Sequence, residues 1–152
     1  MINIDEIMKL LHWNNSHEQQ TLGLQYAKNV NCIKCFFQPQ GKYAGKPVWE
    51  NCAVVISEKT DEALCPYFMD MLFWLQDLNW PGAEIILRRL IDFKQVEQLA
   101  VLMNRIIPVI HSVNDPIWLH VLSQLLQNEM LAEKLSQTVL DILYRASHED
   151  FE

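Results

Sequence analysis

Prolines that recur at a nearly constant spacing constrain the fold of this chain more than any other feature. Pro47, Pro81 and Pro116 lie 34 and 35 residues apart, and each opens a segment with the apolar spacing of a helix. Proline suits the first helical position, because its missing N–H would have no partner inside the helix. A repeat of about 34 residues built from two helices is typical of an α-solenoid.

We therefore expect an all-α fold, a short right-handed α-α superhelix of the HEAT or armadillo type. It should contain about seven or eight helices and essentially no sheet. A chain of 152 residues has the usual size of one domain, so residues 1–152 are expected to form a single helical-repeat domain. A frayed acidic tail is expected at about residues 147–152. The alternative is an irregular helical bundle without a true repeat.

Local signals place several helix boundaries. Asn3 with Glu6, and Ser16 with Gln19, have the spacing of capping boxes and predict two helix starts near the N-terminus. Each polar pair is followed by apolar residues at helical spacing. We expect the chain to begin with two short helices.

Longer helices are expected over residues 64–76, 96–110 and 129–145, where apolar residues recur every three or four positions. The first of these carries an apolar band wide enough to pack on two neighbours. Pro108 lies inside the second helix and should kink or end it, because proline cannot donate the helical hydrogen bond. Glycine and proline predict a loop at residues 38–46.

Residues 74–83 read Trp-Leu-Gln-Asp-Leu-Asn-Trp-Pro-Gly-Ala, and Thr-Asp-Glu-Ala-Leu precedes them at 60–64. Together they resemble the signature of a small bacterial family known only as a domain of unknown function. Leu78 is a departure, since methionine is usual at that position in the family. The likeness covers roughly residues 10–126, including Trp13-Asn14-Asn15-Ser16, Val48-Trp49-Glu50-Asn51-Cys52-Ala53 and Asp115-x-x-Trp118. It implies a HEAT-like helical fold and no established chemistry, and some related small helical domains are thought to be immunity proteins for bacterial toxins.

The segment Asp77-Leu78-Asn79-Trp80-Pro81 admits two interpretations. In the structural one, Asn79 takes the left-handed conformation of a tight turn between helices, and Trp80 is buried against the next helix. In the functional one, Asp77, Asn79 and Trp80 line one edge of a concave binding face, since loop residues often carry function. Both interpretations stay open on sequence alone.

A helical repeat also predicts where a binding face would lie. The second helices of successive repeats line one surface, which is often the binding surface. Trp49 and Trp118 both follow a proline by two positions, where tryptophan would pack between layers or, if exposed, anchor an interface. The candidate binding residues are Trp49, Glu50, Asp77, Asn79, Trp80, Glu84, Arg88, Trp118 and His120.

Charge and hydropathy narrow the class of partner. Twelve Lys and Arg against nineteen Asp and Glu give a net charge of -7, so we expect no nucleic-acid partner. The same charge favours a basic protein partner through steered association. The first residues include acids, and no run of 18 apolar residues occurs, so we expect no membrane segment and a cytoplasmic location.

The sequence contains no recognisable catalytic motif, and we expect no catalytic residues, no metal ligands and no cofactor. The leading hypothesis is a non-catalytic protein–protein interaction module. Its most concrete form, an immunity protein that neutralises a basic toxin, follows from the resemblance alone. One alternative is a helical-repeat enzyme that removes damaged bases and uses the adjacent pair Arg88–Arg89. Another is a zinc-stabilised fold built on Cys32-x-x-Cys35.

Overall fold

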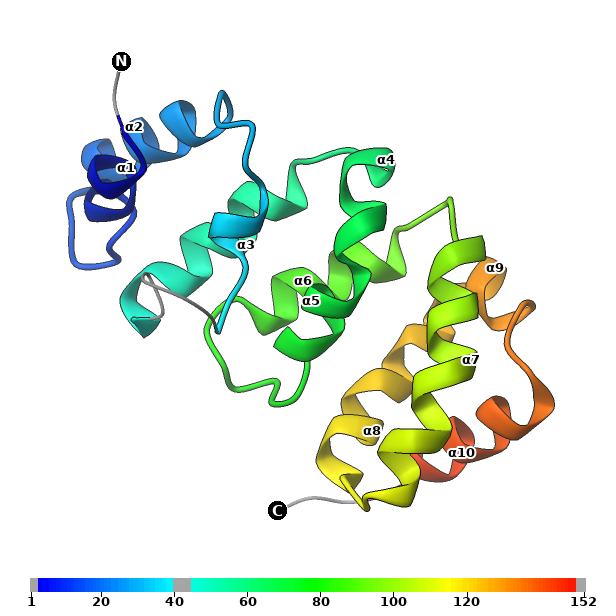
Figure 1. Cartoon of the computed structure of the whole chain (residues 1–152). Helices are drawn as coiled ribbons and strands as arrows, with labels where there is room; N and C mark the ends of the chain where they lie inside the picture. Colours follow the sequence, from blue (N-terminus) through cyan, green and yellow to red (C-terminus); the bar gives the residue numbers. More distant parts are fainter. Residues whose placement is uncertain (1–2, 40–44, 150–152) are drawn as a thin grey trace.

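The computed structural model describes residues 3–39 and 45–149 and is helical throughout (Figure 1). Within these ranges there is no strand, which confirms the predicted all-α class. The α-helices are α1 (Ile4–Leu10), α2 (His17–Ala27), α3 (Trp49–Ser57), α4 (Asp61–Leu64), α5 (Phe68–Trp74), α6 (Ala83–Ile91), α7 (Glu97–Ser112), α8 (Pro116–Ser123), α9 (Glu129–Ala132) and α10 (Gln137–Ser147). The 3₁₀ turns are η1 (Lys34–Phe36), η3 (Lys46–Val48), η4 (Cys65–Tyr67) and η5 (Gln124–Gln127).

The helices that follow the three spaced prolines form one row. Helix α3 packs against α6, and α6 packs against η5, which directly continues α8. Helices α5 and α7 contact each other. Helix α5 also contacts α6, and α7 also contacts α8, so α5 and α7 form a second layer packed against the row. Helix α10 closes the C-terminal end against α7 and α8 (Figure 1). This packing order is consistent with a helical repeat.

Both predicted capping boxes are present. The Asn3 side chain accepts from the backbone N–H of Glu6, and the Glu6 carboxylate accepts from the backbone N–H of Asn3. Ser16 and Gln19 exchange the same pair of hydrogen bonds at the start of α2. These bonds satisfy N–H groups that a helix start leaves without partners.

The apolar band predicted over residues 64–76 forms part of the core, which draws buried side chains from α1 through α10. The members of the band are all buried: Leu64, Phe68, Met71, Leu72, Trp74 and Leu75. The band is not one helix, however, because Pro66 falls in the 3₁₀ turn η4 between α4 and α5. Proline tolerates that position, where no helical N–H is required.

The prediction for residues 129–145 is wrong in the same way, because α9 and α10 are separate helices. The Ser136 hydroxyl accepts from the N–H of Val139 and caps α10, while the Asn104 side chain accepts from the N–H of Ser136. Breaks of this kind give more and shorter helices over the described residues than the seven or eight expected.

Pro108 does not end α7, and Pro81 does not open α6. Helix α7 continues through Pro108 to Ser112, because buried Met103, Ile107 and Ile110 hold it on both sides of the proline. Helix α6 begins at Ala83 rather than at Pro81.

The structure describes only part of the predicted C-terminal tail and of the loop predicted at residues 38–46. Helix α10 ends at Ser147, next to the start of the acidic tail expected at about residues 147–152. Residues 150–152 and most of the predicted loop, residues 40–44, lie outside the described residues. None of the helices in the described ranges is long and apolar enough to span a bilayer.

Polar side chains tie successive layers together at the helix ends. The Asn51 amide donates to the Leu11 carbonyl at 2.7 Å and to the Gln20 side chain at 2.9 Å, which joins α3 to the α1–α2 pair. Asn128, which is buried, donates to the carbonyls of Leu90 and Phe93 and so joins the end of α6 to the start of α9. Side-chain amides placed this way satisfy carbonyls that helix ends leave free.

An ion pair between Arg89 on α6 and Asp61 on α4 also joins neighbouring helices. The Arg89 guanidinium lies 2.7 Å from the Asp61 carboxylate, and the two side chains are 14% and 20% exposed. Arg89 also donates to the carbonyls of Ser57 and Lys59 at the end of α3. Burial would raise the pKa of Asp61, but the N–H groups of Lys94 and Gln95 and the guanidinium outweigh it and lower the pKa.

We therefore expect Asp61→Asn to reduce the free energy of unfolding at pH 7 by about 2 kcal/mol, the scale of hydrogen bonds to a charged group. The folded-state pKa lies below the unfolded value of about 3.9, so the stabilisation is complete above that pH and is lost as the pH falls through the folded pKa. Urea unfolding of the wild type and of Asp61→Asn from pH 7 to pH 3 measures the two free energies of unfolding. The difference between them should become smaller at acid pH. The exposed neighbour Glu62 provides the control, Glu62→Gln, which should change little.

Candidate functional site

Residues Asp77–Gly82, here called the tryptophan turn, connect α5 to α6. The Asp77 carboxylate accepts from the backbone N–H of Asn79 at 2.8 Å, and the Asp77 carbonyl accepts from the N–H of Trp80 at 3.1 Å. The Trp80 carbonyl then accepts from the N–H of Ala83, the first residue of α6. The turn is thus closed by hydrogen bonds along its length.

Gly82 brings this turn against α3. It has a φ of 82°, in the left-handed region that favours glycine. A Cβ atom at this position would lie 2.7 Å from the Cβ of Ala53 and 2.9 Å from the carbonyl oxygen of Trp49. Only glycine therefore allows α6 to start this close to α3.

Tryptophan rings surround the contact. Trp74 is fully buried, and its indole N–H donates to the Pro81 carbonyl at 2.9 Å. The Trp49 ring packs edge to face on Trp74 with centroids 6.3 Å apart, and on Trp80 with centroids 5.7 Å apart. Such pairs add stability beyond the area that they bury.

The structure corrects two details of the predicted turn. Asn79 is not the left-handed residue, because Gly82 takes that conformation here and Asn114 takes it in the turn before α8. The reason is the close approach to Ala53, which only Gly82 can accommodate. Trp80 is half-buried rather than buried, and Trp74 provides the fully buried ring.

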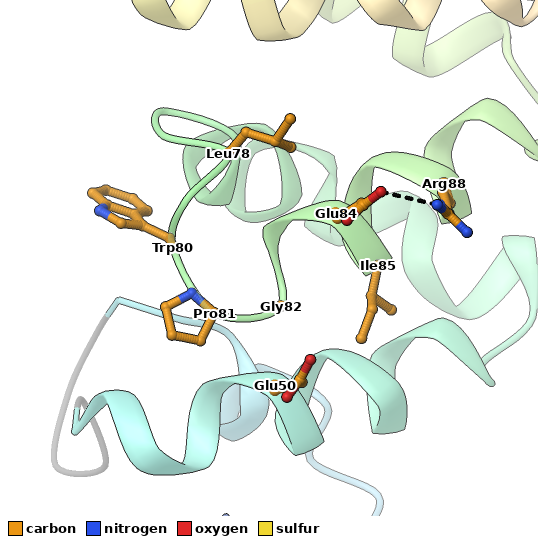
Figure 2. A pocket seen from close by; sticks show the side chains of 8 residues that line it. All are labelled: Glu50, Leu78, Trp80, Pro81, Gly82, Glu84, Ile85 and Arg88. Atoms are coloured by element: carbon orange, nitrogen blue, oxygen red, sulfur yellow. Dashed lines mark hydrogen bonds and ion pairs between the residues drawn. The ribbon is translucent and has the colours of Figure 1, made fainter.

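A hollow of about 310 Å³ lies beside the tryptophan turn, between α3 and α6 (Figure 2). We call it the turn pocket. Its lining residues are Glu50, Leu78, Trp80, Pro81, Gly82, Glu84, Ile85 and Arg88. Four of the predicted binding residues, Glu50, Trp80, Glu84 and Arg88, therefore meet at one place.

Two of the three charged side chains in the turn pocket form an ion pair with each other. The Arg88 guanidinium lies 2.9 Å from the Glu84 carboxylate, one helical turn earlier, and both side chains are largely exposed (Figure 2). Glu50 is exposed and forms no hydrogen bond or ion pair with the described residues. The pocket thus holds one compensated pair and one free carboxylate.

The other predicted residues do not reach this pocket. Asp77 and Asn79 form the preceding part of the turn, and Trp49 lies beneath it with 4% of its surface exposed. Trp118 is also buried, and its indole N–H donates to the Leu72 carbonyl at 3.0 Å. His120 is half-buried with its Nδ1 atom 2.8 Å from the Ala146 carbonyl on α10.

Four lining residues were not among the predicted binding residues: Leu78, Pro81, Gly82 and Ile85. Leu78 is exposed in the turn, and Ile85 is half-buried on α6. For Leu78, the available signal was an apolar residue in a polar turn, where no core contact is expected. Such a residue can indicate an exposed apolar contact surface. Ile85 could not be separated from the core face of α6 by spacing alone.

Among the residues that the structure describes, the cysteines and other potential metal ligands do not gather into a site. Across residues 3–39 and 45–149, no group of three or more His, Cys, Asp or Glu residues is placed to hold a metal ion. Burial raises the pKa of Cys35 to about 12, helped by neighbouring Cys32, and burial raises the pKa of Cys52 to about 12. Both thiols are protonated at neutral pH, and a thiolate is the form that binds metal or attacks a substrate.

The family described as "Domain of unknown function (DUF5071)" matches residues 50–151. The chain belongs to this family. The DUF5071 match confirms the predicted relationship to a domain family of unknown function, and it spans the whole turn pocket from Glu50 to Arg88. Helices α1 and α2 lie before the DUF5071 match. No curated protein and no solved structure matches the chain.

We expect Gly82→Ala to lower the free energy of unfolding by about 3 kcal/mol, since a left-handed alanine and an overpacked contact each cost about 1–2 kcal/mol. Asn79→Ala should change it by less than about 0.5 kcal/mol, as for an exposed residue whose backbone N–H keeps its bond. Denaturant midpoints of both variants measure the difference. Equal losses at the two positions would show that Gly82 is not where the turn meets α3.

Proposed function

We propose that the protein is a non-catalytic protein–protein interaction module and that the turn pocket forms part of its interface. The observation that carries this is the mixed lining of the hollow. Apolar Leu78 and Ile85 lie beside the charged side chains of Glu50, Glu84 and Arg88. Protein interfaces commonly combine an apolar centre with a polar, solvated rim.

The partner that best suits this surface is a basic protein. The net charge of -7 would accelerate association with a positively charged partner. A cytoplasmic immunity protein that neutralises a basic toxin is the most concrete version of the proposal. That version is supported by the resemblance of residues 74–83 to a family whose small helical relatives are thought to include immunity proteins.

The base-removal alternative has less support. It required Arg88 and Arg89 as an adjacent basic pair, but Arg88 is paired with Glu84 and Arg89 with Asp61. A phosphate would have to displace a carboxylate from either guanidinium. The interaction module remains the better account of this face.

The proposal is tested by co-purification of the chain with the product of the neighbouring gene. We expect a stable complex, and Glu50→Arg should weaken it at least about tenfold, because a like charge would face the basic partner. Glu133→Arg is the matched control, since Glu133 is an exposed carboxylate just after α9 and should have little effect. Both variants must keep the wild-type unfolding midpoint.

If the neighbouring product is toxic, co-expression of this chain should restore growth. Capture without rescue would reject the immunity version and keep the interaction module. Absence of any complex, with the protein folded, would reject both with respect to that neighbour.

A further inference from the structure

We propose that the turn pocket binds one arginine side chain of the partner protein and that the Glu50 carboxylate accepts hydrogen bonds from its guanidinium. The inference rests on the proposed function, because it names the chemical group that the pocket recognises. It is drawn from the lining of the pocket, from its charge and from its size.

The arrangement of the lining places a carboxylate opposite an apolar wall. Figure 2 shows Glu50 pointing from α3 toward α6, while Ile85 points from α6 toward Glu50. The backbone at Pro81 and Gly82 closes one side of the gap. A long side chain that enters here would lay its methylene groups on Ile85 and Pro81 and bring its end to Glu50.

The charge of the pocket favours a cation. Arg88 is compensated by Glu84, which also lies in the first turn of α6 and offsets the positive end of that helix. Glu50 then adds an uncompensated negative charge. An anion would face two carboxylates, whereas a cation gains an ion pair without breaking an existing one.

Arginine fits this combination better than a small cation does. Its guanidinium is planar and weakly hydrated, it stacks on apolar and aromatic surfaces, and it can bind a carboxylate through two parallel hydrogen bonds. The apolar surface available for this stacking is that of Ile85 and Pro81, because Figure 2 shows the Trp80 ring pointing away from the gap between Glu50 and Ile85. A volume of about 310 Å³ is at the lower end of ligand pockets, of about 300–1,000 Å³, which suits one side chain rather than a helix.

The test is a titration of the ¹⁵N-labelled chain with N-acetyl-arginine methylamide, followed by NMR. The arginine compound should give saturable shifts at the Gly82 and Ile85 amides. N-acetyl-citrulline methylamide, a neutral compound of nearly the same shape, should give none. Glu50→Gln should weaken arginine binding about three- to fivefold, the scale of an exposed ion pair, whereas Glu133→Gln should leave it unchanged.

Three results would overturn the inference: no shifts at the turn pocket, equal binding of arginine and citrulline, or an unchanged affinity in Glu50→Gln. Failure here is distinguishable from failure of the proposed function. If arginine does not bind but Glu50→Arg still blocks the captured partner, the interface stands and the arginine assignment falls. If arginine binds at Glu50 but no partner is captured, the pocket chemistry stands and the proposed function falls.

Discussion

The contact between Gly82 and α3 is the constraint on which the rest of this structure depends. Because Gly82 has no Cβ, the start of α6 reaches the backbone of Trp49 and the side chain of Ala53. That approach places the Pro81 carbonyl where the indole of Trp74 can donate to it. It also sets α3 and α6 side by side, so the Glu50 carboxylate, which has no partner among the described residues, lies under the first turn of α6. The close packing of the tryptophan turn on α3 and the turn pocket therefore both result from the contact of Gly82 with α3.

Polar side chains divide into two groups with different roles. Asn51, Asn128 and Arg89 are committed to carbonyls or carboxylates at the ends of neighbouring helices, where they join one layer to the next. Their hydrogen bonds are already satisfied, so they have little to offer a partner. Glu50 is the opposite case, since it is exposed and has no partner among the described residues. Glu50 is therefore the side chain that we propose for binding, whereas the other three join neighbouring helices.

The sequence predicted the architecture better than the turns. The proline period predicted that the second helices of successive repeats lie side by side, and the contact between α3 and α6, which brings Glu50, Glu84 and Arg88 together, is consistent with it. It did not separate Asn79 from Gly82, since both residue types tolerate the left-handed conformation. What decides between them is a contact with Ala53, far away in the chain, which no local pattern records.

The same limit applies at other positions where the sequence left two outcomes open. Trp118 matches Trp49 in its position after a proline, yet each ring is buried, so neither is an exposed anchor. Pro108 breaks a local rule, but apolar burial on both sides of it outweighs a cost of about 3 kcal/mol. Tertiary packing decided each case.

Hydrogen exchange of the indole N–H groups tests most directly whether the tryptophan turn is a rigid joint. The indole of Trp74 donates to Pro81 and is fully buried, whereas Trp13 is 45% exposed. We predict that the Trp74 indole N–H exchanges only when the α3–α6 contact unfolds, orders of magnitude more slowly than the Trp13 indole N–H. Exchange of Trp74 as fast as that of Trp13 would contradict it.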